Sequence, residues 1–108
     1  MTTDAYTFLP DLLAEADLPG RGIHSQTLSK ADGVELVLFA MAAGEQLSEH
    51  TSARPAIIHV LSGEGQLVVD GDEHRLEAGS WLRMAPRTAH AIVAGSPMVF
   101  ALYLLPTG

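Results

Sequence analysis

The feature that most constrains the fold is a series of short apolar runs, rich in Val, Ile, Leu and Phe, that begins near residue 22. Turn residues, mostly Gly with Asp, Ser or Pro, separate the runs. Short strands at near-regular spacing with turns between them are typical of a sandwich or a barrel. The sequence therefore predicts an all-β domain. The runs cover residues 22–28, 34–41, 56–61, 65–70, 73–78, 80–85, 89–94 and 98–105.

One turn can be assigned a type. Asp70-Gly71 lies between two strand-like runs, and this dipeptide is typical of a two-residue hairpin in which Gly accepts a positive φ. His50 is expected to lie on a further strand, which a loop connects to the run at 56–61.

Two of the runs, 56–61 and 98–105, are apolar at successive positions and not only at alternate ones. A strand that is apolar on both faces is expected to be buried on both faces. In a barrel, one face fills the interior and the other meets a helix, a sheet or a partner chain. We therefore expect a homodimer that buries one sheet face.

The segment before the first strand is the only candidate for a helix. Residues 4–17 place Leu9, Leu12, Leu13 and Ala16 at helical spacing, and Pro19-Gly20 would end the helix. The expected organisation is a short helical segment, residues 1–20, packed on a barrel formed by residues 21–108.

Composition excludes several classes of function. The net charge is −7 with no basic stripe, so binding to nucleic acid is not expected. The chain has no cysteine, which excludes disulfides and thiolate sites. No apolar run approaches the roughly 20 residues that span a bilayer, and the first residues do not resemble a signal peptide. A cytoplasmic protein without membrane contact is expected.

Two stretches resemble the paired signatures of the cupin family. The first runs from Gly44 through His50 to Gly63, and the second from Gly79 through Pro86 to His90. The resemblance covers about residues 34–104. It implies a double-stranded β-helix, which is a jelly-roll barrel made of two sheets.

The resemblance also implies a metal site. Cupins typically hold a divalent metal with two His and one Glu from the first signature and one His from the second. Carried over by position, the ligands are His50 and His90, whereas Ser52 and Ala56 stand where the family has its second His and its Glu. The implied cofactor is a divalent transition metal such as Zn, Ni, Fe or Mn, held by His50 and His90.

Four further side chains are candidates for pocket lining or an additional ligand: His59, Ser52, Arg83 and Met84. Strand alternation predicts that His59 faces away from a cavity lined by positions 56, 58 and 60, as a core or dimer-interface group. A bulge in the strand would instead turn His59 into the cavity. Arg83 shares a face with Trp81, where it either holds a carboxylate or stacks on the indole at the surface.

Three functions remain open on the sequence alone. In the first, the barrel binds a divalent metal and a small organic ligand, with or without catalysis. In the second, it is a metal-free module that binds or senses a small molecule. In the third, one cavity histidine acts as an acid–base catalyst without metal. The fold does not decide between them, because jelly rolls have many functions.

Overall fold

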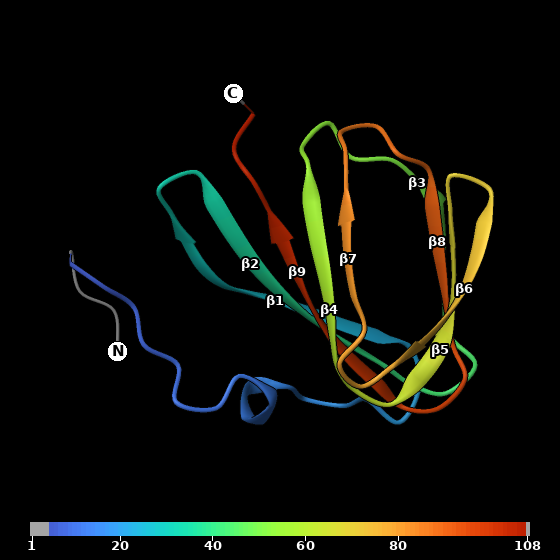
Figure 1. Ribbon diagram of the computed structural model, residues 1–108. Helices are drawn as coiled ribbons and strands as arrows, with labels where there is room; N and C mark the ends of the chain where they lie inside the picture. Colours follow the sequence, from blue (N-terminus) through green and yellow to red (C-terminus); the bar gives the residue numbers. More distant parts are fainter. Residues whose placement is uncertain (1–4, 108) are drawn as a thin grey trace.

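The computed structural model describes residues 5–107, and its ribbon is shown in Figure 1. Within this range the chain forms two antiparallel sheets, in the strand orders β1-β2-β9-β4-β7 and β3-β8-β5-β6. The all-β prediction is confirmed. The strands are β1 (Ile23–Ala31), β2 (Val34–Met41), β3 (Gln46–His50), β4 (Ala56–Ser62), β5 (Glu64–Val69), β6 (Asp72–Glu77), β7 (Trp81–Met84), β8 (His90–Ala94) and β9 (Met98–Leu104).

The space between the two sheets is filled by apolar side chains. Phe39 on β2 lies opposite Phe100 on β9, and the two rings stack with centroids 4.9 Å apart. Ile58 on β4 and Ile92 on β8 reach the same cluster from the two sheets, and each is 1% exposed. Removing such side chains from water provides the main driving force for closing the barrel.

A second apolar cluster lies on the outer face of the five-stranded sheet. It contains Leu38 from β2 and Ala101 from β9, and the segment before β1 covers it with Leu9, Leu12 and Ala16. In Figure 1 this segment runs below and beside β1 and β2. Both faces of β9 are thus buried at its centre, as its apolar sequence predicts.

The helix expected over residues 4–17 is wrong for the part that the structure describes. Residues 5–12 form no helix, and one turn of 3-10 helix, η1 (Leu13–Glu15), is found instead. Pro10 and Pro19 leave too few residues between them for a stable helix, and Ala16 is extended with ψ 142°. The apolar spacing at Leu9, Leu12 and Ala16 reflects contact with the sheet.

The turns follow the sequence closely. Asp70 and Gly71 have φ values of 50° and 83°, which fit the predicted two-residue hairpin between β5 and β6. Gly63 connects β4 to β5 with φ 82°, and a Cβ at this position would collide with the carbonyl oxygen of Pro97. Among residues 5–107 the structure contains no helix long and apolar enough to cross a membrane.

Candidate functional site

Folding brings two histidines from distant parts of the sequence into contact at one end of the barrel. His50 ends β3, His90 begins β8, and the two residues lie directly opposite each other in the four-stranded sheet. Their ring centroids are 4.1 Å apart and the rings are tilted by 56°. Residues opposite each other in an antiparallel pair project on the same face, so both imidazoles reach the inner side of the sheet.

Both imidazoles are held by the backbone in the same way. Nδ1 of His50 lies 2.8 Å from the carbonyl oxygen of Ser48, and Nδ1 of His90 lies 2.9 Å from that of Thr88. A carbonyl oxygen only accepts hydrogen bonds, so Nδ1 is the donor in each ring. In the neutral form, each Nε2 therefore keeps its lone pair. This pattern fixes the tautomer and orientation of histidines that bind metals.

The two rings differ in their exposure. His90 is 6% exposed, and it is the one buried polar residue within the part of the chain described, whereas His50 is exposed to solvent. Burial and the nearby His50 lower the pKa of His90, and the hydrogen bond to Thr88 opposes this shift only in part. His90 is therefore neutral at pH 7, the state in which an imidazole binds a metal.

The space next to the pair is small and apolar. A cavity of about 20 Å³ lies between the imidazoles and side chains that include Phe39, Ile58 and Phe100. This is enough for roughly one water molecule. An organic ligand that contacts both imidazoles must therefore approach from the solvent side, where His50 is exposed.

The two imidazole nitrogens meet some, but not all, of the requirements of a metal site. Two neutral imidazoles with anchored Nδ1 atoms suit zinc, nickel, copper or iron. Protein metal sites usually supply three or more donors, and no group of three His, Cys, Asp or Glu side chains among residues 5–107 could hold an ion. The pair can thus supply two ligands, and the other positions would belong to water or to a bound molecule.

The four additional candidates lie away from this cavity. Ser52 is in the loop after β3, and its hydroxyl accepts a hydrogen bond from the backbone N–H of Arg54. Met84 is buried in the core opposite Ala56. His59 and Arg83 lie on the outer face of the five-stranded sheet, as alternation from the buried Ile58 requires.

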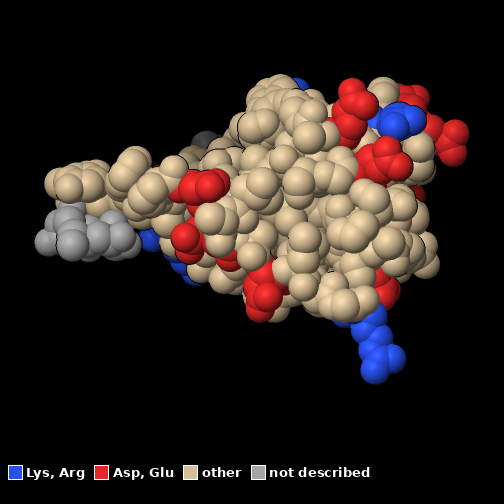
Figure 2. Space-filling model, turned by 90° about the horizontal axis from the view of Figure 1, so that it is seen from below, with Lys and Arg blue, Asp and Glu red and all other residues tan. Residues whose placement is uncertain are grey.

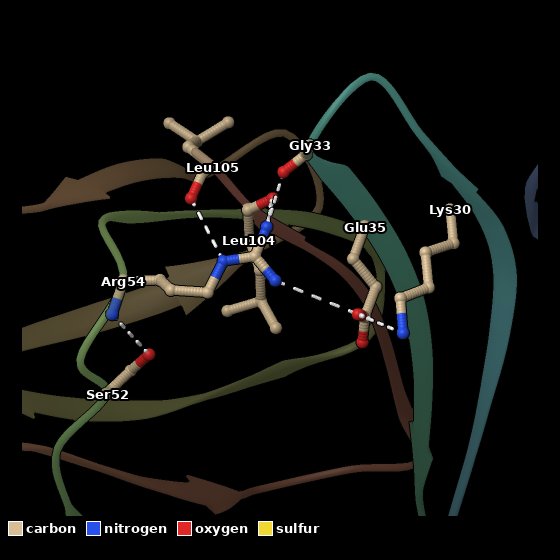
Figure 3. A network of polar contacts seen from close by, with 7 residues as sticks. All are labelled: Lys30, Gly33, Glu35, Ser52, Arg54, Leu104 and Leu105. Atoms are coloured by element: carbon tan, nitrogen blue, oxygen red, sulfur yellow. Dashed lines mark hydrogen bonds and ion pairs between the residues drawn. The ribbon is translucent and has the colours of Figure 1, made fainter. Parts of the chain in front are cut away.

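Arg54 has a role that the sequence did not reveal. Its Nε donates to the carbonyl oxygen of Leu105 at 3.0 Å, and Nη2 donates to those of Leu104, at 3.1 Å, and Gly33. Nη1 lies 3.8 Å from Glu35. Figure 3 shows the guanidinium enclosed by these partners. It therefore ties the loop after His50 to the end of β9 and to the β1–β2 turn.

A family model described as the cupin domain matches residues 37–105. The chain belongs to the cupin family. The match covers most of the strands and includes both histidines of the pair. The cupin resemblance predicted from residues 44–63 and 79–90 is therefore confirmed. No curated protein matches this cupin with significant similarity.

Solved structures show the same fold at low sequence identity. A conserved protein of unknown function from Streptococcus pyogenes is 21% identical, with a TM-score of 0.83, over 95% of this chain and 90% of its own. A cupin superfamily protein from Desulfitobacterium hafniense is 24% identical, with a TM-score of 0.83, over 92% and 90%. The cupin domain of an XRE family transcriptional regulator from Enterobacter cloacae is 22% identical, with a TM-score of 0.71, over 80% and 98%.

Proposed function

We propose that this cupin binds a divalent transition metal through Nε2 of His50 and Nε2 of His90, together with a small chelating organic ligand that reaches the metal from solvent. The observation that carries the proposal is the pair of hydrogen bonds from Nδ1 to the carbonyl oxygens of Ser48 and Thr88. They leave both Nε2 lone pairs free, on two neighbouring rings that line the same small cavity. The two rings that carry these lone pairs are close together, with centroids 4.1 Å apart.

The residues have separate roles in this proposal. His90, buried and neutral, is the fixed ligand. His50, at the solvent side, completes the pair and borders the path by which the organic ligand enters. A bound metal would supply Lewis acidity toward a carbonyl or carboxylate of that ligand. The apolar side chains around the cavity exclude water from the inner side of the site.

The test is metal titration of protein made without a polyhistidine tag and stripped with EDTA. Zn²⁺ and Ni²⁺ should each bind near one equivalent by calorimetry, and His90→Ala or His50→Ala should weaken binding by more than about tenfold. The matched control is His24→Ala, because His24 is an exposed histidine on β1. Equal affinity in His24→Ala and His90→Ala, or less than about a tenth of an equivalent bound by the wild type, would overturn the proposal.

One alternative has support of its own. Among residues 5–107 the donor set lacks a third side chain, and one similar structure is the cupin domain of a transcriptional regulator. These observations favour a metal-free module that senses a small molecule. Thermal-shift screening of EDTA-treated protein against organic acids and sugars separates the two functions. Stabilisation that persists in the His50→Ala variant without metal would support the sensing module.

A further inference from the structure

The barrel has a lateral opening that shares no lining residue with the cavity beside the histidine pair. Within the described chain, β6 pairs only with β5 and β7 only with β4, so the two sheets are not hydrogen-bonded to each other along this side. The turn at residues 78–80 connects these two edge strands, which diverge above it in Figure 1. Between them is a cleft of about 360 Å³, within the range of small-molecule sites.

The floor of the cleft is apolar and belongs to the core. Leu67 on β5 is 1% exposed and Leu76 on β6 is 4% exposed. Leu82 on β7 lies opposite the buried Ile58, so its side chain also faces the interior. A ligand in the cleft would thus remove apolar surface from water.

His74 lines the cleft and faces inward. It lies directly opposite Leu67 in the β5–β6 hairpin, and opposite residues share a face. Its backbone lies on the edge strand, and its side chain is exposed. The structure gives the ring no hydrogen bond to other residues in the range 5–107. A neutral imidazole offers one donor and one acceptor to a ligand.

The rim adds an aromatic surface and a hydroxyl group. Trp81 at the start of β7 lines the cleft and is 61% exposed, which is unusual for so large an apolar side chain. The Ser80 hydroxyl accepts a hydrogen bond from the backbone N–H of Glu77, so its own proton is available to a ligand. An exposed indole beside an apolar floor suits stacking of a planar ring.

The charges around the cleft select against anions. Arg75 is the one charged residue that lines the cleft, and its guanidinium is paired with Glu64 at 2.9 Å. The rest of β6 adds the exposed acidic side chains of Asp72, Glu73 and Glu77. Figure 2 shows acidic side chains gathered around one basic group at the end of the molecule opposite the N-terminal segment. Charged residues along an edge strand also oppose the addition of a further strand, which argues against an extended peptide.

We propose that the cleft between β6 and β7 binds a small planar aromatic molecule, neutral or cationic, that stacks on Trp81 and hydrogen-bonds to His74. This site is separate from the histidine pair and does not depend on a metal. The occupant is a free small molecule, because the acidic edge strand disfavours both anions and peptides.

The experiment uses the intrinsic fluorescence of Trp81, which is the only tryptophan in the chain. EDTA-treated protein is titrated with nicotinamide as a neutral ring, benzamidine as a cation and benzoate as an anion. Nicotinamide and benzamidine should change the emission saturably, whereas benzoate should bind at least about tenfold more weakly. Emission that falls linearly with concentration for all three probes would show collision without binding and would overturn the proposal.

Variants then locate the binding site. His74→Ala should weaken nicotinamide binding about fivefold, the effect of losing one hydrogen bond, and His74→Gln should restore most of it. His24→Ala and His90→Ala should bind like the wild type. Unchanged affinity in His74→Ala, or loss in His90→Ala, would place the ligand elsewhere and overturn the proposal. Because His74→Ala should leave zinc binding intact, failure here is distinguishable from failure of the proposed metal site.

Discussion

At the scale of single residues, the candidate site consists of two adjacent imidazoles that differ in solvent exposure. His50 is exposed and His90 is buried, although both donate Nδ1–H to a carbonyl oxygen two residues earlier. Sequence spacing identified both residues, because the family signature fixes them relative to Gly44 and Gly79. It could not reveal which ring is buried, since burial depends on side chains contributed by β2, β4 and β9.

The lowered pKa of His90 predicts how stability depends on pH. The unfolded chain binds a proton near pH 6.5, whereas folded His90 binds it only at lower pH. The unfolded state therefore holds more protons in this window, and the free energy of unfolding should fall as pH falls below about 6.5. The titratable group that faces His90 is His50, whose proximity acts in the same direction.

This prediction is checked by urea denaturation of EDTA-treated protein between pH 5 and pH 8. The His90→Gln variant keeps a polar side chain but does not titrate, so its stability should fall less over the same range. Wild-type and His90→Gln curves that run parallel with pH would contradict the assignment of a neutral, buried His90.

At the scale of elements, turn residues and strand alternation determine which side chains lie opposite one another. The two-residue turn at Asp70-Gly71 sets the register of the β5–β6 hairpin, so Leu67 must lie opposite His74. The same register places His74 on the inner side of the edge strand, where its exposed side chain borders the cleft. The segment at residues 5–16 could not be predicted in the same way, because its apolar spacing fits a helix but serves contact with the sheet.

Arg54 could not be predicted, because its partners come from two distant elements. Arg54→Met should lower the free energy of unfolding by about 2 kcal/mol, since three backbone carbonyls lose a charged donor. Arg54→Lys should recover only part of the loss, because an ammonium group cannot donate as a planar fork.

The matched control for Arg54 is Arg75→Met. Arg75 also makes an ion pair, with Glu64, but both side chains are exposed. Its loss should cost at most about 0.5 kcal/mol. Guanidinium chloride denaturation of the three variants measures these differences. Equal stability of Arg54→Met and Arg75→Met would show that the contacts of Arg54 do not stabilise the loop after β3.

At the scale of the whole molecule, the sequence predicted the architecture because apolar runs and turn residues are local signals. The size of the cavities is not a local property. It depends on how side chains from both sheets fill the interior. Here Phe39 and Phe100 stack on neighbouring strands of one sheet, and about 20 Å³ is left beside the histidines. The larger spaces lie outside the barrel's mouth, and no sequence motif marked them.

The outer face of the five-stranded sheet leads to the last prediction, a homodimer. The N-terminal segment covers only part of this face. The rest of the face includes Ile57, Leu61 and Tyr103, which are all half-buried. The outward positions of β4 and β9 carry no Lys, Arg, Asp or Glu side chain. Such a face is suited to a second copy of itself about a twofold axis, because each apolar residue then meets another.

Sedimentation equilibrium tests this proposal with a pair of matched variants. Ile57→Glu places a carboxylate in the proposed interface and should convert a dimer to a monomer, because burying an unpaired charge is costly. Val93→Glu makes a comparable change on the outer face of the other sheet, where Val93 is 41% exposed, and should leave the dimer intact. A wild type that sediments as a monomer up to millimolar concentration, or dissociation by Val93→Glu alone, would show that the five-stranded sheet does not form the interface.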